Sequence, residues 1–390
     1  MRILLIANYL PDAQQSMQRY ADWLARSLAT RGHRVSVIRP KPFFSRLTFG
    51  IRRLRAMAKY LGYIDKFVLF PIKLRFEARK HDLAHVLDHS NSMYLAHLHR
   101  HCALITAHDL LAVRAARGEF PEAGTGWSGR ILQRWILRGL RFAPAITCVS
   151  QKTAEDIFTL LPQLHRDAVS IIPNPLNWPY KPTPTRPAFA GIPEPNRSEL
   201  GNGSLYLFHV GANQWYKNRL GVLKIFNELR KLPDFDNIKL IMAGRPWTAP
   251  MREFHRAAGL ADSAFELGGL KSEELQAYYS HAFALLFPSL EEGFGWPILE
   301  AQACGCPVIT SNRPPMNWVA GANDDFSPPA ALLIDPAEPA TAARTIAAEL
   351  APRRAALIEA GFRNLCRFDE AEILESYCSL YQVIARGKIK

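Results

Sequence analysis

The sequence predicts an α/β protein of two domains, each a doubly wound parallel sheet with helices on both faces. Its 390 residues suit two domains. Both halves alternate strand-like apolar runs with helix-like stretches, a pattern typical of parallel sheets. Between the halves, eight of the 23 positions from 173 to 195 are proline, which predicts a semi-rigid linker. Two such domains would face a cleft at the carboxyl ends of their strands, where ligands bind such sheets.

The first half opens with a predicted strand at 2–10, a helix at 16–33 and a strand at 33–40. Apolar residues recur at helical spacing in the helix, and Gly32 suits its end. Further apolar runs at 82–90, 102–110 and 145–150 predict strands that end in polar loops. Together these elements predict a first domain over residues 1–172.

The second half repeats the alternation after a linker at 173–203. Strands are predicted at 204–212, 237–244, 283–290 and 307–312, and helices at 217–232, 272–282 and 297–304, with Ser272 as the N-cap of the second helix. We place the second domain at 204–370. The last helix, 371–390, could pack on either domain.

Composition excludes several classes of protein. With 48% hydrophobic and 21% charged residues, the chain is of ordinary globular type. Its six cysteines form no CxxC pair, which favours reduced thiols over a disulfide framework or a zinc site. No apolar run reaches 18 residues, so no membrane span is expected. The first ten residues are too short an apolar stretch for a signal peptide.

The stretch EEGFGWPILEAQACG at 291–305 carries the first chemical signal. Glu292 follows a predicted strand, and Gly293 and Gly295 allow a tight turn close to a ligand. Pro297 suits the first helical position, and Glu300 would fall in the first turn. Free amides at this helix start form an anion site between two carboxylates.

That arrangement suits a ligand with a negative centre and hydroxyl-rich ends, such as a nucleotide sugar. The alternative is a glycine-rich turn in which Glu300 merely lies favourably on the helix dipole. A second signal is HVGANQWYKN at 209–218, where Gly211 follows a strand and Lys217 could neutralise a phosphate. Taken alone, Lys217 is better explained as a solvated lysine. In a doubly wound sheet, however, both loops lie at the same edge, which strengthens the ligand-binding interpretation of both.

The run SLEEGFGWPILEAQACGCPVITSN, with the preceding segment at 265–289, resembles the Glu-x7-Glu signature of glycosyltransferase family 4. These are retaining enzymes of the GT-B fold, which has two Rossmann-like domains facing a central cleft. Segments 149–157, 172–174 and 209–218 also match the family's pattern. The resemblance is strong over the second half and moderate over the first.

The resemblance assigns roles to individual residues. Glu292 would contact the donor sugar and Glu300 the ribose, while Lys217 would bind the diphosphate. His108 resembles the family's first-domain histidine near sugar and acceptor, although a surface loop histidine is the alternative. The expected catalytic residues are thus His108 and Glu292, and the expected donor-binding residues are Gly211, Lys217, Arg245, Leu270, Phe294, Gly295 and Glu300.

Two departures from the family pattern concern phosphate contacts. The first loop carries Gln15, Ser16 and Met17 where the family often has two glycines; Ser16 could cap the following helix. The second-domain loop lacks the arginine that many members place near the lysine. Arg245, at another strand end, could supply that charge.

The implied reaction moves a sugar from a nucleotide-diphosphate sugar to an acceptor with retained anomeric configuration. A hydrolase pair would flank one scissile bond, whereas both glutamates here belong to one loop and helix.

No cofactor or metal is expected. The Asp-Phe-Asp at 234–236 precedes a strand, away from the cleft, and seven of the twelve histidines fall between 81 and 108 but are not read as a metal site. Alternatives are a nucleotide-sugar epimerase of the same fold and a non-catalytic sugar- or partner-binding protein. A dehydrogenase is disfavoured because the opening strand lacks GxGxxG.

The net charge of +13 is concentrated in two segments. Residues 41–80 hold eleven Lys and Arg against two acidic residues, and GRILQRWILRGLRF adds four arginines. Around 49–62, Ile51, Leu54, Ala58 and Leu61 predict one helical face and basic residues the adjoining one. This favours contact with an anionic membrane from the cytoplasmic side, and hence a glycan or lipid-linked acceptor for cell-envelope or exopolysaccharide synthesis. Solvated faces are the alternative. No RNA- or DNA-binding motif supports nucleic acid.

Overall fold

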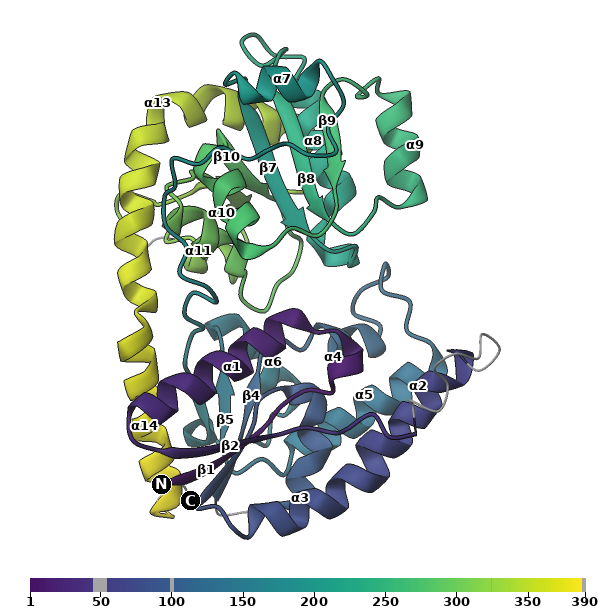
Figure 1. Cartoon of the computed structure of the whole chain (residues 1–390), viewed down its shortest axis with the longest axis vertical. Coiled ribbons are helices and arrows are strands. Elements are labelled where there is room, and N and C mark those ends of the chain that lie inside the picture. The colour runs from purple at the N-terminus through teal and green to yellow at the C-terminus, as the bar shows by residue number, and fades with distance from the viewer. Residues whose placement is uncertain (45–54, 99–101, 324, 388–390) are drawn as a thin grey trace. The chain divides into compact units, whose positions relative to one another are not determined.

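The computed structural model describes residues 1–44, 55–98, 102–323 and 325–387, with the side chains of 55–59 excepted. The chain divides into two compact units (Figure 1). Unit 1 comprises Met1–Asn177 and Glu370–Lys390, and unit 2 comprises Trp178–Asp369. Each unit has one parallel six-stranded sheet between helical layers, which confirms the predicted α/β class with two Rossmann-like units.

The sheet of unit 1 has the order β2-β1-β3-β4-β5-β6. Its strands are β1 (Arg2–Ile6), β2 (Arg34–Ile38), β3 (Leu83–Val86), β4 (Ala103–Ala107), β5 (Ile146–Cys148) and β6 (Val169–Ile171). The strand order reverses at β1, because β2 lies on one side of it and β3 on the other. Such a reversal places the strand-end loops of β1 and β3 beside a ligand position.

Helices cover both faces of this sheet. They are α1 (Gln15–Thr30), α2 (Arg55–Ile64), the π-helix η4 (Asp65–Leu69), α3 (Phe70–Ala78), the 3₁₀ segment η5 (His89–His97), α4 (Leu111–Ala116), α5 (Trp127–Leu140), α6 (Gln151–Leu160) and α14 (Glu370–Ala385), with short 3₁₀ turns at Leu10–Asp12 and Arg166–Ala168. One sheet face buries its apolar side chains against α3, η5, α4, α5 and α6. The other faces α1 and α14 (Figure 1).

The C-terminal helix α14 is joined to the sheet by a buried polar network. The Tyr381 hydroxyl and His85 Nδ1 lie 2.7 Å apart, and the Tyr377 and Tyr20 hydroxyls are also 2.7 Å apart. His85 Nε2 lies 2.7 Å from the Thr106 hydroxyl. Burial lowers the pKa of His85 to about 3, so this imidazole is neutral. The structure therefore assigns the last helix to the first unit, a point the sequence left open.

The sheet of unit 2 has the order β12-β11-β10-β7-β8-β9. Its strands are β7 (Tyr206–Gly211), β8 (Lys239–Gly244), β9 (Ala264–Leu267), β10 (Ala284–Phe287), β11 (Val308–Ser311) and β12 (Leu332–Ile334). The helices are α7 (Asn196–Gly201), the 3₁₀ turn η8 (Trp215–Lys217), α8 (Arg219–Leu229), α9 (Ala249–Ala257), α10 (Ser272–His281), α11 (Trp296–Ala303), α12 (Met316–Val319), α13 (Pro339–Leu365) and the 3₁₀ turn η9 (Cys366–Phe368). Helices α8, α9 and α13 pack on one face of the sheet.

Several details differ from the sequence prediction. The edge strands β6, β9 and β12, each three or four residues long, were not predicted. The proline-rich segment is packed rather than extended. Phe189, 1% exposed, contacts the rings of Tyr206 and Tyr278 within unit 2. Ser272 is the first residue of α10 and not its cap; Lys271 precedes the helix, and its amide donates to Glu274 Oε2 at 2.8 Å.

Within the described ranges, no helix combines the length and the apolar character needed to cross a bilayer.

Candidate functional site

The two loops singled out by the sequence meet at the carboxyl edge of the unit 2 sheet. β7 and β10 are neighbouring parallel strands, so the loops that follow them lie side by side. Lys217 Nζ lies 2.6 Å from Glu292 Oε1, and the two side chains are only 18% and 7% exposed. The structure thus joins two residues that are 75 positions apart in the chain.

The Glu292 carboxylate is held from several sides. The Ser289 hydroxyl donates to the same Oε1 at 2.9 Å, and the Ser289 carbonyl accepts from the Ser311 hydroxyl at 2.6 Å. Lys217 Nζ also lies 5.3 Å from the centre of the Phe287 ring. A buried carboxylate with this fixed geometry is preorganised for a ligand and costs little to orient.

The second glutamate lies on α11, which begins differently from the prediction. The helix starts at Trp296, with Gly295 as its N-cap at φ 112° and Pro297 as its second residue. Glu300 is therefore the fifth helical residue and lies beyond the first turn, which corrects the expected position. It is 5% exposed, and its Oε2 accepts from the Tyr279 hydroxyl at 2.9 Å.

The other predicted donor residues lie at the same edge of the sheet. Phe294 is 5% exposed and packs its ring on Phe368 at 5.7 Å, so its backbone amide is the group that could serve a ligand. Gly295 takes a left-handed conformation that only glycine adopts without strain. Gly211 ends β7, and half-buried Leu270 lies in the loop after β9.

Gly211 and Gly244 are paired residues at the ends of β7 and β8. A Cβ on Gly244 would lie 2.1 Å from the Gly211 carbonyl oxygen, and Gly244 has φ 132°. Both strand-end loops therefore depend on this glycine for their close approach.

Replacing Gly244 by alanine is expected to lower the free energy of unfolding by roughly 3 kcal/mol. The backbone at Gly211 would have to move away from the new Cβ, and alanine would be strained at the φ angle of Gly244. Chemical denaturation would measure the loss. Gly201→Ala is the control, because a Cβ there meets nothing within 4 Å and should change stability little. Equal stability of both variants would contradict the proposed close contact.

A buried arginine that the sequence analysis missed lies beside this pair of loops. Arg219 is 4% exposed; its Nη1 donates to the Arg245 carbonyl at 2.6 Å and to the Asn213 side chain. Among the described residues, its Nε and Nη2 have no hydrogen-bond partner. Arg219 is the first residue of α8, where the helix dipole disfavours a cation. That unfavourable placement was a signal that the sequence contained.

His209 is a second missed residue at this position. Its Nδ1 lies 2.9 Å from the Leu286 carbonyl, which accepts the ring proton and leaves Nε2 as an acceptor. Burial lowers the pKa of His209 to about 3, with Arg219 and Lys217 acting in the same direction. The imidazole is therefore neutral, and the positive charge of the region comes from Lys217, Arg219 and the exposed Arg245.

In unit 1, His108 follows β4 and is 7% exposed. Its Nε2 lies 2.9 Å from the Leu87 carbonyl, so Nε2 carries the proton. Burial lowers the pKa of His108, although nearby Asp88 opposes the shift. Nδ1 has no hydrogen-bond partner among the described residues. Nδ1 of His108 is thus a buried, unprotonated hydrogen-bond acceptor.

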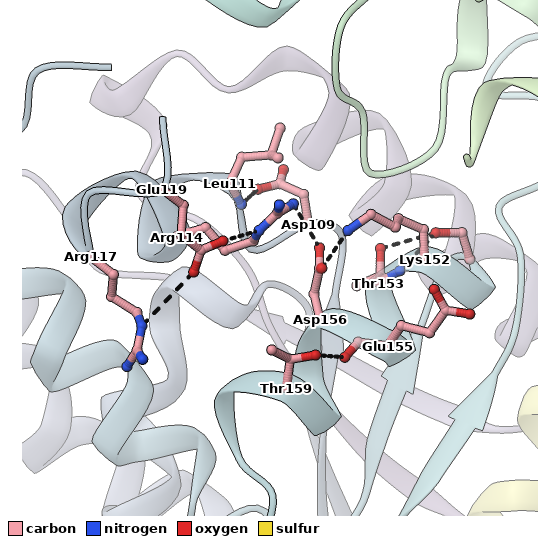
Figure 2. Close-up of polar contacts among 11 residues, drawn as sticks. Asp109, Leu111, Arg114, Arg117, Glu119, Lys152, Thr153, Glu155, Asp156 and Thr159 are labelled. Atoms are coloured by element: carbon pink, nitrogen blue, oxygen red, sulfur yellow. Dashed lines mark hydrogen bonds and ion pairs between the residues drawn. The ribbon is translucent and has the colours of Figure 1, made fainter. Parts of the chain in front are cut away.

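Asp109, which supported the interpretation of His108, has a local structural role. Its Oδ1 accepts from the Leu111 amide at 3.0 Å, at the start of α4. Figure 2 shows the charged network beside it, in which Arg114 lies between Glu119 and Asp156, and Lys152 also reaches Asp156. This network joins α4 to α6 and so fixes the loops that follow β4 and β5.

The first-loop residues lie at the start of α1. The helix begins at Gln15, with Gln14 before it, so Ser16 is the second helical residue and not the cap. Gln15 and Ser16 are exposed and Met17 is half-buried. The loop contains a polar cluster that the sequence analysis missed: Asn8 donates to both Gln14 and Asp88 and accepts from Asn91 Nδ2 at 3.1 Å. Its signal was a polar residue two positions after the end of each of two apolar strands, Asn8 after β1 and Asp88 after β3.

The remaining sequence candidates for metal binding are not assembled. Asp234 and Asp236 lie in the turn before β8, at the amino end of the strand, as predicted. In the described parts of the chain, no group of three or more His, Cys, Asp or Glu side chains could hold a metal ion. Independence from metal stays a prediction.

The fold and these residues define a class. The family described as glycosyl transferases group 1 matches residues 193–363, and the one described as glycosyltransferase family 4 matches residues 17–177. The chain therefore belongs to the glycosyltransferases of family 4 type, with the GT-B fold.

Individual proteins show how far the likeness extends. The chain is 28% identical to an O-antigen chain mannosyltransferase B of Escherichia coli over 62% of this chain and 60% of that protein, so the match spans less than two thirds of the relative. Sucrose-phosphate synthase of Thermosynechococcus elongatus has a similar fold, with a TM-score of 0.68 at 19% identity over 98% of each chain. HepE of Anabaena, solved with UDP and glucose, gives a TM-score of 0.65 at 18% identity over 98% of this chain and 99% of that one. The last two show the fold alone.

Proposed function

We propose that the protein is a retaining hexosyltransferase that moves a sugar from a nucleotide-diphosphate sugar to an acceptor in cell-envelope or exopolysaccharide glycan synthesis. The observation that carries the proposal is the buried Lys217–Glu292 pair beside the glycine-led start of α11. The O-antigen role named for the E. coli relative supports the glycan class, and the UDP and glucose held by HepE support the donor class.

Unit 2 would bind the donor. Lys217 and the amides of Phe294 and Gly295 would hold the diphosphate, whose negative charge grows as the sugar leaves. Glu292 would hold hydroxyls of the donor sugar, and Glu300 those of the ribose. Gly211 would let the backbone approach the donor, and Leu270 would contact the base. No metal or cofactor is needed in this scheme, because cationic and amide groups neutralise the leaving group.

Lys217 would change partners when the donor binds. Lys217 neutralises Glu292 in the structure, and an arriving diphosphate would compete for the same ammonium group. Its transfer to phosphate would release Glu292 Oε1 toward the sugar. Donor binding would thereby prepare the carboxylate for its own role.

The exposed Arg245 adds a positive charge at the adjoining strand end. Arg245→Ala is expected to weaken binding of a nucleoside diphosphate by roughly tenfold, the effect of losing one charge-assisted hydrogen bond. Isothermal titration with UDP and GDP would measure the dissociation constants. Arg256→Ala, which removes an exposed arginine of α9, serves as the control. Unchanged affinity in Arg245→Ala would remove Arg245 from the donor site.

Unit 1 would bind the acceptor through the loops that follow β1, β3 and β4. Neutral His108 would accept a hydrogen bond from a sugar hydroxyl through Nδ1, and Gln15, Ser16 and Met17 would contribute contacts at the start of α1. A glycan or lipid-linked acceptor suits the basic character of this unit. We place the protein on the cytoplasmic face of an anionic membrane, held there by the charge of residues 41–80 and of α5, and expect no nucleic-acid partner.

A thermal-shift panel of nucleotide sugars tests the function, since a ligand that binds only the folded state raises the melting temperature. We expect stabilisation by one donor in the presence of EDTA, followed by sugar transfer whose product keeps the anomeric configuration. Conversion of the donor without an acceptor would indicate an epimerase, and binding without transfer to any acceptor a binding protein. No stabilisation by any nucleotide sugar would overturn the proposal.

A further inference from the structure

The outer surface of unit 1 exposes an unusual row of apolar side chains. Helices α2, η4 and α3 follow one another without a break from 55 to 78. Every fourth side chain along the described part is a large exposed apolar one: Tyr60 (63% exposed), Ile64 (36%), Val68 (55%), Ile72 (55%) and Phe76 (60%). We refer to these five residues as the apolar row.

The opposite side of the same helix is already buried. Phe70, Leu74 and Ala78 are at most 9% exposed and belong to the core under the sheet. A helix with apolar residues on two opposite sides normally has both sides covered. The described residues therefore leave the apolar row without the cover that its composition calls for.

Helix α5 extends this surface. Trp127 (77% exposed), Ile131 (55%) and Trp135 (42%) recur every four residues on its outer side. The ring of Trp135 lies 4.9 Å from that of Phe67 on η4, so the two helices are in direct contact. We refer to the apolar row and these three residues of α5 together as the exposed face. It includes tryptophan and tyrosine residues, the types enriched at membrane interfaces.

Positive charge borders this face. The exposed basic residues are Lys73, Arg75, Arg79 and Lys80 near α3, and Arg130, Arg134, Arg138 and Arg141 on or directly after α5. Residues 127–141 contain no acidic residue. Of the two acidic residues in 60–80, Asp65 is 1% exposed and accepts from the Tyr9 hydroxyl and the Phe44 amide, and Glu77 lies 3.1 Å from Lys80.

We infer that this face inserts its apolar row and the tryptophans of α5 into the headgroup layer of an anionic bilayer, with the flanking Lys and Arg on lipid phosphates. The inference deepens the membrane association proposed above and rests on it. A second copy of the chain fits the same face less well, because a two-fold contact would bring the arginines of α5 against each other. Anionic lipid neutralises them.

The experiment measures retention of the full chain by phosphatidylcholine vesicles with and without phosphatidylglycerol, at low and high salt. Charge contacts are screened by salt and apolar insertion is not. We expect binding to the anionic vesicles that weakens but persists at high salt. Val68→Glu should lower the partition coefficient roughly tenfold or more, because a charge must enter the interface.

Val383→Glu is the matched control, since Val383 is 40% exposed on α14 of the same unit. Equal retention of Val68→Glu and the wild type, or an equal loss in both variants, would overturn the inference. The inference would also be overturned if the wild type did not bind vesicles but formed a salt-sensitive dimer, detected by light scattering, that Val68→Glu abolishes. Thermal stabilisation by the donor, measured in the same variants, distinguishes the two proposals. Val68→Glu should leave this stabilisation unchanged. Its absence in the wild type would count against the transferase function alone.

Discussion

Glu292→Gln is expected to lower kcat/KM by about 10²–10³-fold, the usual effect of removing one preorganised polar group from a transition state. Glutamine keeps the size of the side chain but loses the negative charge that would hold sugar hydroxyls and face the developing positive charge at the anomeric carbon. Binding of a nucleoside diphosphate should stay within a few-fold of wild type, because Lys217 is then free for phosphate. Steady-state kinetics and calorimetry would separate the two effects.

The matched variant is Glu300→Gln, eight positions further on. It removes charge from a carboxylate equally buried and held by Tyr279. If Glu300 contacts the ribose, nucleoside diphosphate binding should weaken by roughly tenfold, and kcat at saturating donor should fall much less. An identical pattern in both variants would indicate that the loop and α11 are merely structural.

Lys217→Met should weaken donor binding and lower the free energy of unfolding. It leaves the Glu292 carboxylate buried without its cation, and breaking such a pair from one side costs about 3–5 kcal/mol. Glu292→Gln should cost less, because Lys217 is more exposed, at 18% against 7%, and can turn to water. The double variant Lys217→Met/Glu292→Gln should regain much of the stability lost in Lys217→Met and remain inactive.

Denaturant unfolding of the four proteins gives the coupling energy directly. Lys231→Met is the control: its ion pair with Glu228 has the same 2.6 Å distance, but the side chains are 60% and 32% exposed. An exposed pair contributes about 1 kcal/mol or less. If Lys217→Met and Lys231→Met lower the free energy of unfolding equally, burial does not determine the strength of the Lys217–Glu292 pair.

The sequence predicted the sheets well because long apolar runs alternate with helical periodicity. Parallel sheets also place strand-end loops at one edge, so the sequence alone predicts that Lys217 and Glu292 lie near each other. The direct ion pair could not be predicted, because side-chain partners depend on which strands are neighbours. β7 lies between β8, the next strand in the chain, and β10, whose following loop carries Glu292. Arg219 was missed for a similar reason: its contacts come from loops after two different strands.

The exposed apolar row of unit 1 was only partly predicted. The expected apolar face, Ile51, Leu54, Ala58 and Leu61, lies largely outside the residues whose side chains are described. Leu61 is half-buried, whereas the exposed row runs through Tyr60 and Val68. Period alone could not tell the two faces apart, because both sides of this helix are apolar. The arginines of α5 are exposed as expected.

The packing of α14 has a consequence for how the protein is made. Domains generally fold as units during synthesis, from the N-terminus onward. Here the first unit needs Tyr377 and Tyr381 to satisfy Tyr20 and His85, and these residues are translated only after the whole of unit 2. Unit 2, contained within Trp178–Asp369, has all of its residues earlier. The later-translated unit can therefore be complete while the earlier one still waits for its last helix.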